Sequence, residues 1–381
     1  MKSSPFRLNL PSSIEFGRGC ANGAAAAIRS RGQRILLVHG GRSERAGWLV
    51  ESLAAEDAAL ETMACPREPD LALVEAGVEV GRAQGAEVVV ALGGGAAIDL
   101  AKALAGLIPA RGAVLDYLEV LGSGAALDAT PLPWVALPTT AGTGAEVTAN
   151  AVIGVPEAQR KVSLRDPRLL ADLALVDPAL TDDTPRSVTL ASGLDAITQV
   201  IEPYISREAN PFTDLLCQDA APRGLRALQV LMESESSAAR DGMAWVSLCG
   251  GLALANAKLG AVHGLAGPLG GVLSAPHGAI AGALLPPVLQ ANREVCQGES
   301  ARRIDEALDW IGEAFDVDRP GALEALTHWS RRHGLPGLEA MGLRVADRRG
   351  IAEAATGSSS MRGNPVALSV SRLIEVMEAA A

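Results

Sequence analysis

Short apolar runs alternate with amphipathic stretches through the first half of the chain. Arg34–Val38, Ala86–Leu92 and Pro133–Leu137 consist almost entirely of apolar residues, without the polar alternation of a half-exposed strand. Continuous runs of this kind are typical of strands that are buried on both faces, as in a parallel sheet covered by helices. The pattern therefore predicts stacked βα units and a mainly parallel sheet.

The ends of one helix can be predicted residue by residue. Asp70 is suited to the N-cap, because its carboxylate can accept a hydrogen bond from a free backbone N–H of the first turn. Apolar residues then recur at Leu73, Val74 and Val78, and Gly85 suits the left-handed conformation that ends many helices. The sequence predicts a helix between Asp70 and Gly85.

Helical patterns replace the strands from about Pro185 onward. The candidate helices cover residues 186–205, 211–230, 238–257, 278–290, 301–314, 320–332 and 366–380. No repeat or low-complexity linker separates the two halves. The change of pattern predicts an α/β domain over residues 1–184 and an all-helical domain over residues 185–381, and 381 residues suit two domains.

One uncharged segment, Leu259–Asn292, is long enough to cross a bilayer. Glycines and prolines interrupt it repeatedly, it carries His263 and His277, and it has no basic flank. These features predict a segment buried inside the protein, so no contact with a membrane is expected.

The composition indicates which binding partners and which cellular compartment to expect. The 44 acidic and 33 basic residues give a formal charge of -11, which repels phosphate backbones, so we expect no nucleic acid partner. The five cysteines are scattered and form no CxxC pair, as in proteins with reduced thiols. Pro5 and Pro11 interrupt the N-terminal residues, which lack the apolar stretch of a signal peptide. The sequence predicts a cytoplasmic protein.

Two glycine-rich turns follow predicted strands. Gly93–Gly95 joins a strand to a helix, and the backbone N–H groups of such a turn can bind a phosphate at the helix N-terminus. The turn matches neither the P-loop nor the GxGxxG pattern, so an ordinary tight turn stays an alternative. The second turn, Pro138–Gly144, offers the hydroxyls of Thr139, Thr140 and Thr143 to a phosphate, a ribose or an amide.

Four residues of the second half are candidate metal ligands. Asp195 and Gln199 are one helical turn apart, which suits two ligands of one ion. His263 and His277 lie in the uncharged segment, where an imidazole without a partner would be costly. A buried metal would satisfy both histidines, but hydrogen-bonded core histidines are the alternative. Spacing alone does not bring residue 195 to residue 277.

Four strings of residues together resemble the iron-containing (group III) alcohol dehydrogenase family. They are Gly93–Lys102, Pro138–Glu146, Gly193–Glu202 and His263–Gly278, and the resemblance extends from Ile14–Gly17 to Gly363–Pro365. It implies a Rossmann-like dinucleotide-binding domain followed by an all-helical domain, as in dehydroquinate synthase, with metal and substrate between them. It also implies hydride transfer between NAD or NADP and an aldehyde or ketone, and a homodimer.

The resemblance assigns roles residue by residue. The family's cofactor pattern falls on Gly93, Gly94, Gly95, Asp99, Thr139, Thr140, Thr143 and Lys161, of which Lys161 would reach the nicotinamide ribose. Its metal pattern falls on Asp195, Gln199, His263 and His277, and Asp195, His263 and His277 are also the expected catalytic residues.

The chain departs from the family pattern at two active-site positions. Gln199 stands where most members have histidine, and Gly267 replaces a second histidine. Because an amide oxygen is a weaker donor than imidazole, we expect a weakly bound Fe²⁺ or Zn²⁺ ion. The maleylacetate reductases, a related group, resemble metal-independent enzymes, so metal-free catalysis stays an alternative.

A third departure concerns the cofactor. NAD-preferring members often carry an acidic residue after the first strand, whereas this chain has Gly40 and then Arg42. The missing carboxylate leaves room for a 2′-phosphate, with which Arg42 could pair, so NADP is favoured over NAD.

The leading hypothesis is thus an NAD(P)-dependent alcohol dehydrogenase or aldehyde reductase that uses a metal. One alternative is a metal-independent reductase of a maleylacetate-like oxo acid, with His263 or His277 as the general acid. The others are a dehydroquinate-synthase-like lyase and a catalytically inactive, nucleotide-binding regulatory protein.

Overall fold

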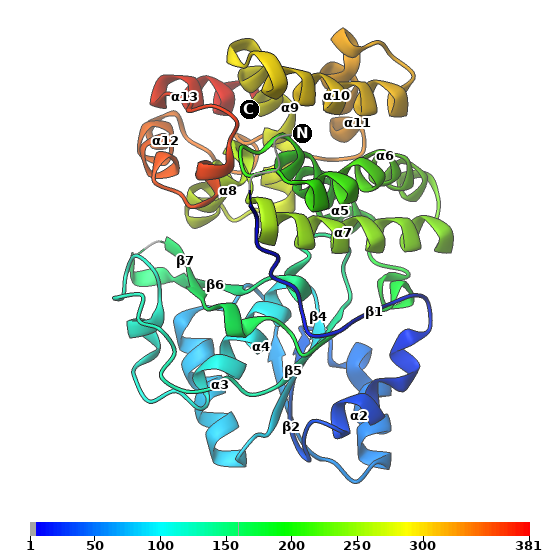
Figure 1. Ribbon diagram of the computed structural model, residues 1–381, viewed down its shortest axis with the longest axis vertical. Coiled ribbons are helices and arrows are strands. Elements are labelled where there is room, and N and C mark those ends of the chain that lie inside the picture. Colours follow the sequence, from blue (N-terminus) through cyan, green and yellow to red (C-terminus); the bar gives the residue numbers. More distant parts are fainter. Residues whose placement is uncertain (1–4, 159) are drawn as a thin grey trace. The chain divides into compact units, whose positions relative to one another are not determined.

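The computed structural model describes residues 5–158 and 160–381. They form two compact units (Figure 1): an α/β unit of residues 9–140 and 144–182, and a helical unit of residues 5–8, 141–143 and 183–381. The main part of the helical unit therefore starts at Asp183 instead of Pro185, and the unit also includes residues 5–8 and 141–143 from the range predicted for the α/β domain. Residues 141–143 belong to it because Gly142 packs against the backbone of Ser192.

The α/β unit is built on a parallel sheet of six strands in the order β1-β8-β5-β4-β2-β3. The strands are β1 (Ile14–Phe16), β2 (Arg34–Gly40), β3 (Ala59–Cys65), β4 (Val88–Gly93), β5 (Trp134–Pro138) and β8 (Leu173–Val176). All residues of β4 and β5 are buried, so the predicted sheet of fully buried parallel strands is confirmed. The sequence did not predict β1, β3 and β8. Of these, β1 and β3 lie at the sheet edges and expose most of their residues.

Helices cover both faces of this sheet. They are α1 (Ala24–Arg29), α2 (Gly47–Ala55), α3 (Leu71–Gln84) and α4 (Gly95–Leu107). Leu36 and Val38 of β2 share one apolar core with α3 and α4, whereas Ile35 and Leu37 share another with α1 and α2. A separate antiparallel hairpin consists of β6 (Asn150–Val155) and β7 (Arg160–Arg165).

Both predicted ends of α3 are confirmed. Asp70 Oδ1 accepts a hydrogen bond from the Leu73 backbone N–H at 2.9 Å, and Gly85 ends the helix at a φ of 66°. Asp70 Oδ2 also pairs with Arg67 at 2.8 Å.

The strand order reverses between β2 and β4. The chain runs from β2 outward to β3, returns through α3 to β4 on the other side of β2, and continues to β5. In such sheets ligands bind beyond the carboxyl ends of the strands at the point of reversal. Here those ends are Gly40 and Gly93.

The helical unit is arranged around α5, which is buried from Gly193 to Ile205. Its helices are α5 (Arg186–Ile205), α6 (Pro211–Glu233), α7 (Ser237–Ala257), α8 (Ala261–Val272), α9 (His277–Val295), α10 (Gly298–Phe315), α11 (Ala322–Arg332), α12 (Arg348–Thr356) and α13 (Val370–Ala379). The sequence analysis missed α8 and α12. Five glycine or proline residues weaken the helical signal of α8, and tertiary packing outweighs that low propensity.

Among the described residues, no single helix has the length and apolar character needed to span a membrane. Within the part of the chain that the structure describes, α7 and α8 are the one helix pair that meets that test together, and they are bent by 100° at their junction.

Candidate functional site

One face of α5 carries a buried polar stripe. Asp195, Gln199 and Glu202 follow one another at helical spacing and expose 1%, 3% and 1% of their surface. Apolar residues surround them, as Leu194, Ile197 and others of α5 belong to the main core of the unit. Buried polar groups of this kind require partners.

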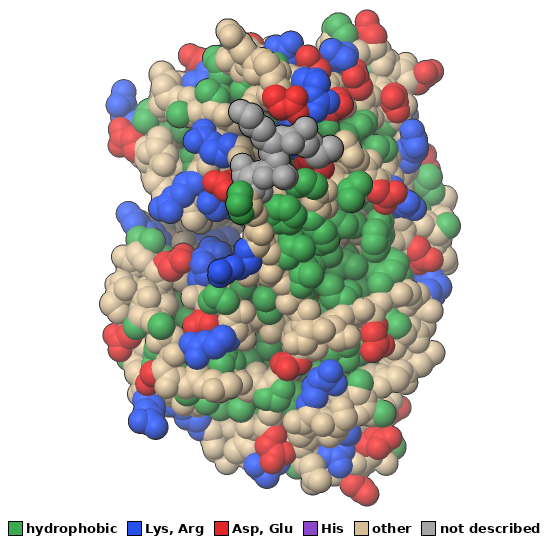
Figure 2. All heavy atoms as spheres, viewed as in Figure 1, with side chains coloured by type: hydrophobic (Ala, Val, Ile, Leu, Met, Phe, Trp, Pro, Cys, Tyr) green, Lys and Arg blue, Asp and Glu red, His purple; other side chains and the backbone are tan. Residues whose placement is uncertain are grey.

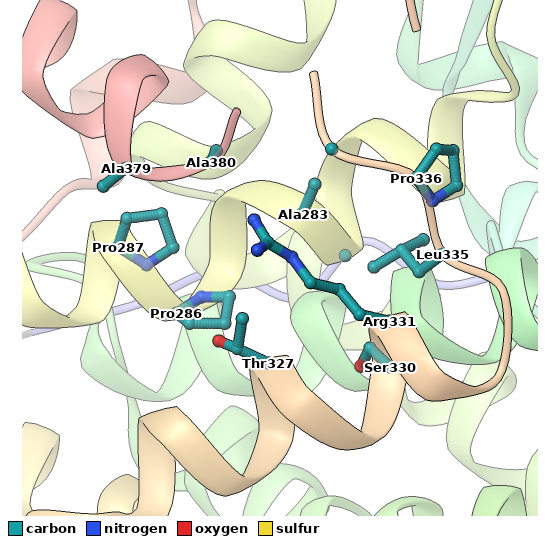
Figure 3. Close-up of a pocket in the computed structure, with 12 residues that line it drawn as sticks. Ala283, Pro286, Pro287, Thr327, Ser330, Arg331, Leu335, Pro336, Ala379 and Ala380 are labelled. Atoms are coloured by element: carbon teal, nitrogen blue, oxygen red, sulfur yellow. The ribbon is translucent and has the colours of Figure 1, made fainter. Parts of the chain in front are cut away.

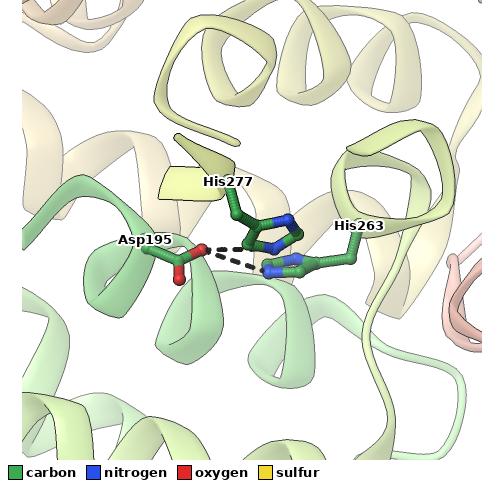
Figure 4. A group of neighbouring side chains, drawn as sticks. All are labelled: Asp195, His263 and His277. Atoms are coloured by element: carbon green, nitrogen blue, oxygen red, sulfur yellow. Dashed lines mark ion pairs between the residues drawn. The ribbon is translucent and has the colours of Figure 1, made fainter. Parts of the chain in front are cut away.

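Two histidines from other helices meet this stripe (Figure 4). His263 comes from α8 and His277 is the first residue of α9. The Nε2 atoms of His263 and His277 lie 3.3 Å and 3.8 Å from Asp195 Oδ1. The two ring centroids are 5.4 Å apart. The structure therefore brings together residues 195, 263 and 277, which sequence spacing could not connect.

Glu202 determines which nitrogen of His263 faces the group. Glu202 Oε2 lies 2.6 Å from His263 Nδ1, and Oε1 accepts a hydrogen bond from the Val262 N–H at 2.7 Å. A carboxylate can only accept, so His263 donates through Nδ1 and its Nε2 points toward Asp195. The sequence analysis missed this residue, although it lies on the same helical face as Asp195.

The donor atoms fit a metal ion. Asp195 Oδ1 and His263 Nε2 are buried, and neither has an aligned hydrogen-bond partner among the residues described. One ligand atom from each of Asp195, His263 and His277 lies within 4.8 Å of the others. A carboxylate and two imidazoles suit Zn²⁺ and Fe²⁺, and the contact from Glu202 to His263 is the second-layer bond usual for metal-binding histidines.

The electrostatics of the group favour positive charge. Burial raises the pKa of Asp195, but His277 and His263 outweigh that effect and lower it below the usual value. Burial lowers the pKa of His263, whereas the neighbouring carboxylates of Asp195 and Glu202 outweigh that effect and raise it to about 10. The negative charge of the two carboxylates therefore stabilises a cation bound at this site.

Gln199 lies beside Asp195 and contacts the segment 141–143. Its Nε2 donates to the Gly142 carbonyl oxygen at 3.1 Å. Gly267 lies on α8, and a Cβ added there would find no described atom within 4 Å. Its role as the position of a missing histidine stays a prediction.

In the α/β unit, the first glycine turn forms a close cradle. A Cβ on Gly93 would lie 2.6 Å from the Ala97 Cβ, and one on Gly94 would lie 3.1 Å from Thr140 Oγ1. The Thr139 N–H donates to the Gly93 carbonyl at 2.9 Å. Only glycine leaves space at this turn, where the N-terminus of α4 favours an anion. The turn therefore fits the phosphates of a dinucleotide.

The predicted cofactor residues lie in several different parts of the fold. Gly40, Gly93, Gly94, Gly95, Thr139 and Thr140 gather at the carboxyl ends of β2, β4 and β5. Asp99 on α4 accepts a hydrogen bond from the Val152 N–H, and Arg42 is exposed before a short 3-10 helix, Ser43–Ala46. Lys161 on β7 pairs with Glu68. Thr143 belongs to the helical unit.

A buried lysine of α4, to which the sequence analysis assigned no role, lies beside the residues that follow the second glycine turn. Lys102 is fully buried and donates to the Ala145 carbonyl, Thr148 Oγ1 and the Asn150 carbonyl at 2.7–2.8 Å. Burial lowers the pKa of Lys102 to about 8 and raises that of the nearby Glu146 to about 7. Lys102 thereby fixes the residues that follow the second glycine turn.

Comparison with known families decides the identity. The family described as "Iron-containing alcohol dehydrogenase" matches residues 11–178, and "Fe-containing alcohol dehydrogenase family, C-terminal" matches residues 189–381. The chain belongs to the iron-containing alcohol dehydrogenase family. The resemblance seen in its sequence strings is confirmed.

Individual members of the iron-containing alcohol dehydrogenase family match over most of their length. Lactaldehyde reductase of Escherichia coli (strain K12) is 31% identical over 98% of this chain and 99% of its own. Alcohol dehydrogenase 4 of Saccharomyces cerevisiae (strain ATCC 204508 / S288c) is 33% identical over 82% of this chain and 80% of its own. The crystal structure of 1,3-propanediol oxidoreductase has a TM-score of 0.88 and 27% identity, covering 99% of this chain and 100% of that chain. The predicted fold class is confirmed.

A small hollow of about 30 Å³ lies elsewhere in the helical unit (Figure 3). Pro286, Pro287, Ser330 and Arg331 are among the residues that line it. It includes none of the three candidate metal ligands and has room for only about one or two water molecules. We assign it no part in the chemistry.

Proposed function

We propose that this family member is an NAD(P)-dependent oxidoreductase that interconverts an alcohol and an aldehyde or ketone with the help of a divalent metal ion. The observation that carries the proposal is the group of Asp195, His263 and His277, which each bring one ligand atom within 4.8 Å of the others. Asp195 Oδ1 and His263 Nε2 are buried and have no hydrogen-bond partner among the described residues. The names lactaldehyde reductase and alcohol dehydrogenase 4, borne by two relatives, support the same reaction class.

Some residues of the chain would bind the metal, and another would orient one of these ligands. Asp195, His263 and His277 would hold the metal, and Glu202 keeps His263 in the required tautomer. When bound, the metal supplies a Lewis acid that polarises the carbonyl oxygen of the substrate. Gln199 is the proposed fourth ligand, through its amide oxygen.

The α/β unit would bind the dinucleotide. Gly93–Gly95, Thr139 and Thr140 would hold its phosphates through backbone N–H groups and hydroxyls. Asp99, Thr143 and Lys161 are proposed for the remaining contacts. The bound nicotinamide supplies or accepts the hydride.

We favour NADP over NAD for a reason of space and charge. A Cβ on Gly40 would meet no described atom within 4 Å, so the carboxyl end of β2 is open. Arg42 follows closely and is exposed. A guanidinium there could pair with a 2′-phosphate, and residue 40 offers no carboxylate to bind the ribose hydroxyls.

A homodimer is the proposed assembly. Phe6, Leu8 and Leu10 alternate along the chain and expose 47%, 39% and 41% of their surface. Figure 2 shows hydrophobic side chains gathered near the middle of one face, among interspersed acidic and basic residues. A second copy of the chain would cover such apolar surface, and light scattering after size-exclusion chromatography would give the mass in solution. The proposed location is the cytoplasm.

Elemental analysis of protein purified anaerobically, without chelators or a metal column, tests the function. We expect about one Fe or Zn ion per chain, lost in Asp195→Ala and kept in the surface variant Asp309→Ala. His277→Ala should abolish turnover of an aldehyde panel while NADPH binding is unchanged. Metal-free protein that binds NADPH and reduces oxo acids would favour the metal-independent reductase. Protein that binds a nucleotide but turns over no substrate would favour a regulatory role.

A further inference from the structure

We propose that Asn364 is a positioning residue of the metal site: together with Glu202 it caps the N-terminus of α8 and so places His263. The inference rests on the proposed function, because it concerns how one of the same metal ligands would be held. It also gives a role to the string Gly363–Pro365, which lies at the end of the resemblance seen in the sequence.

The N-terminus of α8 has no side-chain cap of its own. Its N-cap residue is Gly260, and the first backbone N–H groups of a helix have no acceptor within the helix. The first two of these groups belong to Ala261 and Val262, which are fully buried. Because burial keeps water away, acceptors from elsewhere in the chain must take these hydrogen bonds.

Two side chains from distant parts of the chain supply the acceptors. Asn364 Oδ1 accepts a hydrogen bond from the Ala261 N–H at 3.0 Å. Glu202 Oε1 accepts one from the Val262 N–H at 2.7 Å. A Cβ on Gly260 would lie 2.8 Å from Glu202 Oε1 and 2.9 Å from Asn364 Oδ1, so both oxygens face the same helix end. Together they cap the first turn of α8.

The side-chain amide of Asn364 has a single orientation. Its Nδ2 donates to the Val366 carbonyl oxygen and to Asn292 Oδ1, both at 2.7 Å. Its Oδ1 accepts from Asn292 Nδ2 at 3.1 Å as well as from Ala261. A backbone carbonyl only accepts and a backbone N–H only donates, so exchanging the oxygen and the nitrogen would lose bonds on both sides. Asn364 and Asn292 are 1% and 0% exposed, so water cannot easily replace these bonds.

The backbone of the capping segment is also anchored. The carbonyl oxygens of Gly363 and Asn364 accept hydrogen bonds from the backbone N–H and the Nε of Arg207, at 3.0 Å and 2.8 Å. A Cβ on Gly363 would lie 2.0 Å from the Leu259 carbonyl oxygen, so only glycine lets the segment lie this close to the residues before α8. Arg207, which follows α5, thus fixes the segment that caps α8.

The cap bears on the direction of a metal ligand. His263 is the third residue of α8, two residues after Ala261. Glu202 binds its Nδ1 at 2.6 Å, and its Nε2 lies 3.3 Å from Asp195 Oδ1, so a shift of the first turn would displace Nε2. Without Asn364 the Ala261 N–H would be buried without an acceptor, and moving the turn toward water would reduce that cost. Metal binding should therefore weaken although no ligand is removed.

Zinc binding to the full-length protein tests the proposal. In Asn364→Ala we expect the dissociation constant for Zn²⁺, measured by competition with a chromophoric chelator, to rise about tenfold, as for other residues that orient metal ligands. Asn210→Ala is the matched control, because Asn210 is also buried and caps α6, which carries no candidate ligand. Both variants should lower the melting temperature, but Asn210→Ala should bind Zn²⁺ like the wild type. An unchanged constant in Asn364→Ala, or an equal rise in both variants, would overturn the proposal.

Nuclear magnetic resonance of the metal-free protein gives a readout that does not depend on the metal. The Nδ1–H proton of His263, bonded to Glu202, should change its chemical shift in Asn364→Ala and keep it in Asn210→Ala. An unchanged shift in Asn364→Ala would overturn the proposal. In the wild type, the Ala261 amide should exchange slowly with solvent, and fast exchange would overturn the cap even if Asn364→Ala failed to fold. A wild type that binds neither Zn²⁺ nor Fe²⁺ would refute the proposed function instead, and the His263 proton would still decide the role of Asn364.

Discussion

His263 Nδ1 and Glu202 Oε2 lie 2.6 Å apart, and both side chains are buried. The contact joins the start of α8 to the polar stripe of α5. Glu202 also accepts a hydrogen bond from the Val262 N–H, so one carboxylate fixes both the backbone and the ring of the neighbouring helix. The packing of the two helices therefore fixes the direction in which His263 Nε2 points.

Glu202→Gln should weaken metal binding without removing a ligand. The amide keeps one acceptor oxygen but loses the charge that raises the basicity of the imidazole, so we expect the dissociation constant for Zn²⁺ to rise about 10- to 100-fold. Competition with a chromophoric chelator measures it. Glu353→Gln, on the exposed surface of α12, is the matched control. Equal affinities of Glu202→Gln and wild type would refute the orienting role.

Gly93→Ala should destabilise the α/β unit. The added methyl group would lie 2.6 Å from the Ala97 Cβ, so β4 or α4 must shift, at a cost of about 1–3 kcal/mol in the free energy of unfolding. Hydrogen exchange of the β4 amides would report the loss. Ala97→Gly in the same chain should recover part of it by restoring space. Gly23→Ala, where a Cβ would meet no described atom within 4 Å, should have little effect.

Arg42→Ala should reduce the preference for NADPH. If its guanidinium pairs with the 2′-phosphate, its loss raises the dissociation constant of NADPH by about tenfold or more and leaves that of NADH nearly unchanged. Fluorescence titration of both dinucleotides gives the two constants. Arg349→Ala, an exposed arginine of α12, is the control. Comparable efficiency with both cofactors, unaffected by Arg42→Ala, would contradict the proposed preference.

Glu146→Gln should change how stability depends on pH. Burial raises the pKa of Glu146 from 4.5 to about 7, so the folded protein holds this proton more tightly than the unfolded chain does. Its contribution to stability is therefore present below pH 4.5 and is lost as the pH rises through about 7. Between about pH 5 and pH 8 the wild type should lose stability relative to Glu146→Gln. Melting temperatures at both pH values test this, with the exposed Glu157→Gln as reference. A pH-independent difference would contradict the prediction.

Sequence patterns predicted the parts of the structure that depend on local physics. The buried strands β2, β4 and β5 were visible as apolar runs, and both caps of α3 were visible as single residues with known conformational preferences. The resemblance carried by four strings correctly indicated the family. Each of these signals lies within a short stretch of chain.

The parts that the sequence did not predict depend on contacts between distant residues. Glu202 looks like any acidic residue near the end of a helix until α8 places His263 beside it. The direction of the Gln199 amide depends on the Gly142 carbonyl, which the sequence alone cannot bring to α5. The helix α8 forms despite its glycines and proline, because burial in the core outweighs local preference.

The chain path gives the segment 141–143 a further significance. The polypeptide leaves the α/β unit at residue 141, returns to it at residue 144 and leaves it again at Asp183. No single cut therefore separates the two units. A fragment that begins at Asp183 would lack the Gly142 carbonyl and leave the Gln199 amide without its acceptor. Chimaeras that exchange the helical unit between relatives should accordingly retain both residues from the same parent.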